Sequence, residues 1–220
     1  MQTILQERPV RTNDDPDDNG QQAVNADCYS AGKRRTMLLT QELRGRWFGP
    51  LLSAVERLGV TPNHLTLLSN LAGLAFCPLY FWSKPVAFGM LMLHVLLDGL
   101  DGPLARQTGL ASRQGSFTDT MSDQTVVVLS TITLMFSQTI SVLPGGLYIF
   151  LYTVVVLFAM ARNALSIPYS WLVRPRFFIY GWLIVETWFL PGTINVLLWI
   201  ANLLLGWKML TGFVYIRRKI

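Results

Sequence analysis

The residues with the clearest capacity for chemistry are four aspartates in one short stretch. Beyond Glu56 the 220-residue chain has only five acidic residues, and four of them are Asp98, Asp101, Asp119 and Asp123. Spacings of three and of four residues place each pair on one face of a helix. Hard divalent ions such as Mg²⁺ and Mn²⁺ prefer clustered carboxylate oxygens. The pattern therefore favours a metal site formed by two facing helices.

Structural ion pairs are the alternative for these acids. Arg106 and Arg113 lie in the same stretch and could pair with the aspartates at the level of the lipid headgroups. Two bases cannot neutralise four acids, so the metal site is the preferred interpretation and the ion pairs stay open. Gly99, Gly102 and Ala105 would leave room for a diphosphate or a planar base beside the acids, although small residues in membranes also serve helix packing.

Composition indicates what kind of helices carry these acids. Hydrophobic residues make up 51% of the chain and charged residues 14%, and the mean hydropathy is +0.38. Soluble domains carry about 25% charged residues, so the composition predicts a protein that faces lipid. The net charge of +5 is spread over loops rather than gathered in one patch, and we therefore expect no nucleic-acid partner.

Six apolar segments follow the first 60 residues, and each is a predicted membrane span. They are Leu65 to Trp82, Val86 to about Arg106, Phe117 to about Leu143, Leu147 to Ile167, Phe177 to Leu190, and Ile194 to Ile216. The predicted fold is therefore an all-α integral membrane protein with six transmembrane helices. The membrane domain would occupy residues 61–220.

The N-terminal 60 residues divide into two parts. Residues 1–40 are polar and poor in apolar side chains, which predicts a disordered arm. Residues 41–60 mix basic with apolar side chains, as in an amphipathic helix that lies in the headgroup layer. An ordinary amphipathic packing helix explains the second pattern equally well.

Basic residues predict the orientation, because Lys and Arg near span ends stay on the cytoplasmic side. One set of loops contains nearly all of them, including Arg174 and Arg176, whereas the other contains only Lys84. Both termini and the aspartates are therefore expected at the cytoplasmic face of the membrane. Glu186 and His94 lie within spans and are interpreted as paired inside the bundle.

The window from Asp98 to Asp123 resembles the signature of the CDP-alcohol phosphotransferases, also called CDP-alcohol phosphatidyltransferases. It reads DGLDGPLARQTGLASRQGSFTDTMSD, and all eight fixed positions and every gap of the signature match. The upstream TPNHLT, residues 61–66, is similar to the Pro-Asn-x-x-Thr element that opens the first span of the family. The likeness extends over most of residues 40–216.

The resemblance implies an enzyme of phospholipid biosynthesis with a two-metal site for Mg²⁺ or Mn²⁺. Such an enzyme transfers a phospho-alcohol from a CDP-alcohol, here CDP-diacylglycerol, to the hydroxyl of a small polar alcohol or alcohol phosphate, and releases CMP. By position, Asp98, Asp101, Asp119 and Asp123 would bind metal, and Asp123 would also be the general base. The donor would contact Gly102, Ala105, Arg106, Gly115, Asn63 and Thr66. Family members are commonly dimers, which leaves a homodimer open.

The acceptor substrate is the part of the predicted reaction that the sequence specifies least. Arg162, within the fourth span, and Arg113 are candidate ligands of an acceptor phosphate, although a snorkelling or salt-bridged Arg162 is an equal alternative. Arg174 and Arg176 are explained by topology alone. Relatives that use glycerol phosphate usually have an Arg after the first-span element and a Gly-Lys-x-Lys-Thr stretch after span three. In this chain Ser69 and SVLPGG occupy these two places, which disfavours a lipid made from glycerol phosphate as the product.

Two other classes compete with this interpretation. Intramembrane prenyl transferases bind diphosphates through metals and Asp motifs, but usually on separated helices of a larger bundle. A non-catalytic divalent-cation transporter would place acids near the bilayer midplane. The two aspartate pairs lie on neighbouring spans near one membrane face, and this disfavours both alternatives.

Overall fold

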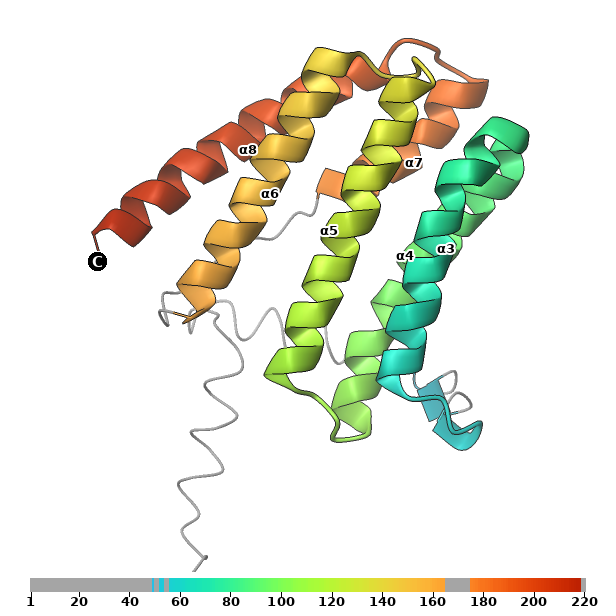
Figure 1. Cartoon of the computed structure of the whole chain (residues 1–220), viewed down its shortest axis with the longest axis vertical. Coiled ribbons are helices and arrows are strands. Elements are labelled where there is room, and N and C mark those ends of the chain that lie inside the picture. Colours follow the sequence, from blue (N-terminus) through green and yellow to red (C-terminus); the bar gives the residue numbers. More distant parts are fainter. Residues whose placement is uncertain (1–48, 50–51, 54–55, 165–174, 219–220) are drawn as a thin grey trace, which may run out of the picture.

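A computed structural model describes Gly49, Leu52, Ser53 and residues 56–164 and 175–218, and the regular structure in these ranges is helical. Six long helices follow one another: α3 (Pro62–Trp82), α4 (Lys84–Gln107), α5 (Arg113–Phe136), α6 (Val142–Ala164), α7 (Pro175–Trp188) and α8 (Ile194–Arg217). Figure 1 shows them packed side by side as one bundle. The predicted arm of residues 1–40 lies outside the described residues, as does most of the predicted helix of residues 41–60.

Four of the helices described are long and apolar enough to cross a membrane: α3, α4, α6 and α8. The chain is therefore an integral membrane protein with an all-α fold. The expectation of six helices is confirmed, but the prediction that all six cross the membrane is not. Helix α7 has 14 residues, or about 21 Å at 1.5 Å per residue, which is shorter than a hydrocarbon core of about 30 Å. Helix α5 carries polar residues along its N-terminal half.

The predicted boundary between the third and fourth spans was wrong. Helix α5 ends at Phe136 rather than near Leu143, and α6 begins at Val142 rather than at Leu147. Gln138 adopts a positive φ of 59°, which ends the helix, and the amides of Thr139 and Ile140 donate to the carbonyl of Leu134. Pro144 is tolerated in the first turn of α6 because the amides there have no partner within the helix.

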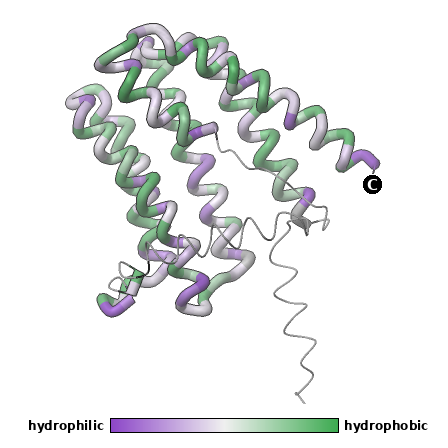
Figure 2. The backbone as a smooth tube through the Cα atoms, turned by 180° about the vertical axis from the view of Figure 1, so that it is seen from behind, coloured by the Kyte–Doolittle hydropathy of each residue, from purple (hydrophilic) through white to green (hydrophobic). Residues whose placement is uncertain are grey.

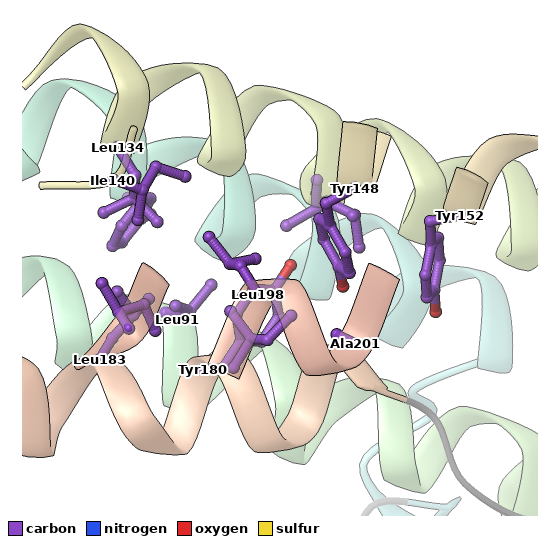
Figure 3. Close-up of a cluster of buried hydrophobic side chains, with 14 of the residues drawn as sticks. Leu91, Leu134, Ile140, Tyr148, Tyr152, Tyr180, Leu183, Leu198 and Ala201 are labelled. Atoms are coloured by element: carbon purple, nitrogen blue, oxygen red, sulfur yellow. The ribbon is translucent and has the colours of Figure 1, made fainter. Parts of the chain in front are cut away.

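The helices pack so that α5 connects two halves of the bundle. Helix α3 lies along α4, α6 lies along α8, and α5 contacts both α3 and α6, while α7 packs against α4 and α8. The largest buried cluster lies between these elements, and Figure 3 shows Tyr148 and Tyr152 of α6 beside Tyr180 of α7 within it. Figure 2 shows that hydrophilic residues interrupt the apolar bundle mainly in its lower half.

A glycine allows the close approach of α3 to α5. A Cβ atom on Gly73 would lie 2.7 Å from both methyl carbons of Val126, which is too close for a real contact. Val126 is only 1% exposed and has one strongly preferred rotamer in a helix. It follows Asp123 by three residues, so this contact also sets the position of the acidic face of α5.

Candidate metal and nucleotide site

The structure brings the aspartates of α4 and α5 to one place. One carboxylate oxygen each from Asp98, Asp119 and Asp123 lie within 4.8 Å of one another. Asp101 is 6% exposed and accepts a hydrogen bond of 2.9 Å from the hydroxyl of Thr66 on α3. The geometry thus contains the facing carboxylate pairs that the helical spacing predicted.

Local sequence explains why α4 and α5 face each other here. Helix α4 ends at Gln107 and is capped by Thr108, whose hydroxyl donates to the carbonyl of Leu104. Gly109 follows with a φ of +69°. This left-handed conformation costs glycine little and other residues more. Ser112 then caps α5 by accepting a 3.0 Å hydrogen bond from the amide of Gly115. A short turn thereby reverses the chain between the two aspartate pairs.

The start of α3 completes the same end of the bundle. Thr61 accepts from the amide of His64, and the His64 side chain accepts from the amide of Thr61, which forms a reciprocal cap with Pro62 in the first turn. The helix therefore begins three residues before the predicted Leu65. This start aims Asn63 and Thr66 at the pocket described next.

A pocket of about 630 Å³ opens beside the carboxylates, within the range of small-molecule sites. Helices α3, α4, α5 and α7 and the turn before α5 contribute to its wall. The lining residues comprise the three acids Asp98, Asp101 and Asp119, the six proposed donor ligands Asn63, Thr66, Gly102, Ala105, Arg106 and Gly115, and Pro62, Gly99, Pro103, Leu110, Ala111, Ser112, Ser116, Phe177 and Phe178.

The glycines of α4 keep this pocket open. A Cβ atom on Gly99 would meet nothing within 4 Å, and one on Gly102 would meet only the Arg106 guanidinium at 3.6 Å. The backbone of α4 is therefore accessible to a ligand beside Asp98 and Asp101, as the small residues suggested. Asp123 is not among the lining residues and pairs with Arg176 of α7.

Arg176 is the residue of this cluster that the sequence analysis did not identify. It is 2% exposed, its Nη2 lies 2.8 Å from Oδ2 of Asp98, and its Nη1 pairs with Oδ2 of Asp123. Topology alone does not explain a buried arginine, so that interpretation of Arg176 was wrong. The sequence did contain a signal for such a residue. The four aspartates outnumber the two arginines near them in the sequence, so a further cation was needed to balance their charge.

Arg106 does not fill that role, since it is exposed and lines the pocket. The side chain of Arg113 lies outside the described residues. The ion-pair alternative is therefore realised in part, through an arginine that the sequence analysis had not considered for it. The pocket beside Asp98, Asp101 and Asp119 remains open next to the pairs.

Arg162 lies at a distance from this pocket. Its guanidinium carbon stands 5.1 Å from the centroid of the Tyr215 ring of α8, and it is not among the pocket-lining residues. A cation over an aromatic face is a stabilising arrangement in itself. The role of Arg162 in holding an acceptor phosphate stays a prediction.

Glu186 and His94 are paired inside the bundle, as expected. Glu186 accepts from the amides of Gly192 and Ile194, at 2.5 and 2.8 Å, at the start of α8. Nδ1 of His94 lies 2.9 Å from the Ser69 hydroxyl, and Nε2 lies 3.9 Å from Oδ1 of Asp123. His94 thus borders the aspartate cluster, which its position one helical turn before Asp98 permits.

The donor set fits a divalent metal. Three carboxylate oxygens converge within bonding reach of a common ion, oxygen ligands are those that Mg²⁺ and Mn²⁺ prefer, and the adjoining pocket leaves space for ligands other than protein. Asp98, Asp119 and Asp123 would hold such an ion, with Asp101 beside them.

Comparisons with known proteins agree with this geometry. The chain is 37% identical over 103 residues to archaetidylinositol phosphate synthase of Aeropyrum pernix, and this match covers 44% of this chain and 53% of that protein. It is 32% identical over 111 residues to CDP-diacylglycerol–serine O-phosphatidyltransferase of Mycobacterium leprae, and this match covers 49% of this chain and 37% of that protein. The matches thus span about half or less of these curated relatives.

Solved structures show the same fold. The crystal structure of Mycobacterium tuberculosis phosphatidylinositol phosphate synthase with CDP-DAG bound superposes with a TM-score of 0.64 and 20% identity, over 74% of this chain and 90% of that one. The same enzyme in complex with manganese and citrate gives a TM-score of 0.65 and 20% identity, over 74% and 86%.

The family model described as CDP-alcohol phosphatidyltransferase matches residues 59–214, more than half of the chain. That range contains the two aspartate pairs, the pocket and helices α3 to α7. The chain belongs to the CDP-alcohol phosphatidyltransferase family.

Proposed function

We propose that the protein transfers a phosphatidyl group from CDP-diacylglycerol to the hydroxyl of a small polar alcohol or alcohol phosphate and releases CMP, as a step of phospholipid biosynthesis. The observation that carries the proposal is the open pocket of about 630 Å³ with Asp98, Asp101 and Asp119 in its wall. Family membership and the names of the relatives support the donor class.

The nucleotide end of the donor would occupy the polar pocket. Gly99 and Gly102 let the diphosphate approach the α4 backbone, and Arg106 offers a guanidinium at the rim. Asn63 and Thr66 present polar groups from the opposite wall. The acyl chains would remain in the bilayer beside the apolar helices.

Asp98, Asp101, Asp119 and Asp123 would hold Mg²⁺ or Mn²⁺ in this reaction. Bound divalent ions neutralise charge on the diphosphate and on the departing CMP. Asp123 is proposed as the general base, accepting the proton of the attacking acceptor hydroxyl.

The acceptor would enter from the side of Asp123. Arg162 and Arg113 are the candidate ligands of a phosphorylated acceptor, because arginine binds phosphate well. The active site and both termini would face the cytoplasm of a prokaryotic cell, because basic residues concentrate on that side. The protein would work in the membrane, and a homodimer remains a proposal.

An acceptor screen tests the function. Purified protein in detergent would receive labelled CDP-diacylglycerol, Mn²⁺ or Mg²⁺, and one alcohol at a time: serine, inositol, inositol phosphate, glycerol phosphate and glycerol. We expect one class of alcohol to give a new lipid with an equal amount of CMP, and EDTA to stop both. Absence of a lipid product with every alcohol, in protein that binds the donor, would contradict phosphatidyl transfer to these acceptors.

A further inference from the structure

Arg176 places a positive charge inside the carboxylate cluster. Its two terminal nitrogens contact different helices, Asp98 on α4 and Asp123 on α5, while the residue itself belongs to α7. Both aspartates also supply oxygens to the group that could hold a metal ion. The guanidinium and a metal ion would therefore bind the same two carboxylates.

We propose that Arg176 is a built-in counter-ion that competes with divalent metal for Asp98 and Asp123, so that metal binding requires the guanidinium to move away. This inference rests on the proposed metal site and goes beyond it, because it assigns the metal-free protein a distinct, self-neutralised arrangement. In that arrangement an internal cation takes the place of one metal ion.

Electrostatic repulsion disfavours simultaneous binding of the two cations. The candidate ligand atoms lie within 4.8 Å of one another, and the guanidinium contacts two of the three aspartates. A divalent ion bound there would stand within about 5 Å of the arginine charge, where repulsion inside a protein is strong. Water screens this repulsion little, since Arg176 is 2% exposed.

The bundle offers the displaced guanidinium an alternative environment. Tyr180 lies one helical turn beyond Arg176 on α7, and Tyr152 and Tyr180 are close enough to interact with its charge. The buried hydroxyl of Tyr148 and Nε of Arg176 have no hydrogen-bond partner in the described structure. The three tyrosines belong to one buried cluster, and Figure 3 shows Tyr148 and Tyr152 next to each other within it. In the proposed metal-bound arrangement Arg176 turns toward these hydroxyls.

Competition lowers the apparent affinity for metal. Only the fraction of molecules with Arg176 turned away can bind metal tightly, so the measured dissociation constant is the intrinsic one divided by that fraction. Removing the guanidinium should therefore tighten metal binding. A residue that merely supported the site would have the opposite effect when removed.

Titration with Mn²⁺ alone, followed by electron paramagnetic resonance of the free ion, measures this affinity without catalysis. We expect Arg176→Gln to bind Mn²⁺ at least about tenfold more tightly than wild type. Arg176→Lys keeps one charge but cannot contact both carboxylates through a fork, and should fall between the two. Arg218→Gln removes a positive charge from the exposed end of α8 and should match wild type.

Thermal unfolding provides a second readout. Without metal, Arg176→Gln removes the guanidinium charge from beside Asp98 and Asp123 and should lower the unfolding midpoint, whereas saturating Mn²⁺ should restore most of the loss. If Arg176→Gln does not fold, the Mn²⁺ affinity of Arg176→Lys, compared with that of wild type, tests the competition by itself.

The outcomes separate this inference from the proposed function. Unchanged or weaker Mn²⁺ binding in the Arg176 variants, with measurable binding in wild type, would overturn the competition and leave the metal site intact. Absence of Mn²⁺ binding in wild type and in every variant would overturn the metal site and the competition together.

Discussion

The hydroxyl of Thr66 donates a hydrogen bond of 2.9 Å to Oδ2 of Asp101 and thereby joins the start of α3 to the acidic end of α4. The same hydroxyl lies 3.2 Å from the carbonyl of Pro62, one turn earlier. Thr66 lines the pocket, but its direct partner is a carboxylate. It therefore acts as a positioning residue for Asp101.

Thr66→Val should weaken metal binding, because Asp101 loses the donor that fixes its orientation. Loss of such outer partners costs about 10- to 100-fold in metal affinity, and Thr66→Ser should retain most of it. A titration with Mn²⁺ measures the change. Thr125→Val is the matched control, since the Thr125 hydroxyl only donates to the carbonyl of Met121 in its own helix. Equal affinities in Thr66→Val and wild type would contradict the positioning role.

Gly73→Ala should destabilise the protein, because the new methyl group would meet Val126 at 2.7 Å. Overpacking of this kind costs about 1–3 kcal/mol, and the displaced α5 should also lower the affinity for Mn²⁺. The midpoint of thermal unfolding in detergent measures the first effect.

Two variants test the cause of that loss. The double variant Gly73→Ala, Val126→Ala should recover stability, since space is returned at the contact. Gly89→Ala is the matched control on α4, where a Cβ atom meets nothing within 4 Å. A loss of stability in Gly89→Ala as large as in Gly73→Ala would assign the effect to glycine in general.

Glu186→Ala should also lower stability, by a mechanism separate from the site. Its carboxylate accepts from the amides of Gly192 and Ile194 and from the Thr193 hydroxyl, at the positive end of α8. Leaving buried donors unpaired costs about 1–3 kcal/mol. We expect a lower unfolding midpoint with unchanged Mn²⁺ affinity, and a fall in Mn²⁺ affinity at an unchanged midpoint would show a role at the site instead.

Much of the site could be predicted from local spacing. Aspartates three and four residues apart must share a helix face, and a turn between them at Gly109 makes the faces meet. The start of α3 was also readable, because Thr61 and Pro62 are typical residues for the beginning of a helix.

Long-range packing explains what could not be predicted. Arg176 follows Asp98 by 78 residues, and their contact depends on how α7 packs against α4. The end of α5 was missed because Gln138, unlike glycine, gives no signal for a positive φ, while Val142 and Leu143 continue the apolar pattern across the turn. The predicted fifth span, Phe177 to Leu190, was already short, and its assignment rested partly on the neighbouring spans; α7 has 14 residues.

Asp123→Asn should abolish transfer while the protein still binds CDP-diacylglycerol. An amide cannot accept the hydroxyl proton, and loss of a general base costs about 10²- to 10⁴-fold in rate. Initial rates of CMP release, compared with equilibrium binding of the donor, separate the two effects. Because Asp123 also pairs with Arg176, the unfolding midpoint must be measured alongside. Wild-type turnover in this variant would exclude Asp123 as the base.

The central claim is that the carboxylates of α4 and α5 bind the CDP donor through divalent metal. Equilibrium binding of radiolabelled CDP-diacylglycerol to the purified protein, with Mn²⁺ and after EDTA, tests it most directly. We predict saturable binding with Mn²⁺ that is lost after EDTA and in Asp119→Asn, but kept in Glu56→Gln, which removes an exposed carboxylate outside the cluster. Binding that is equally tight after EDTA and in Asp119→Asn would contradict the claim.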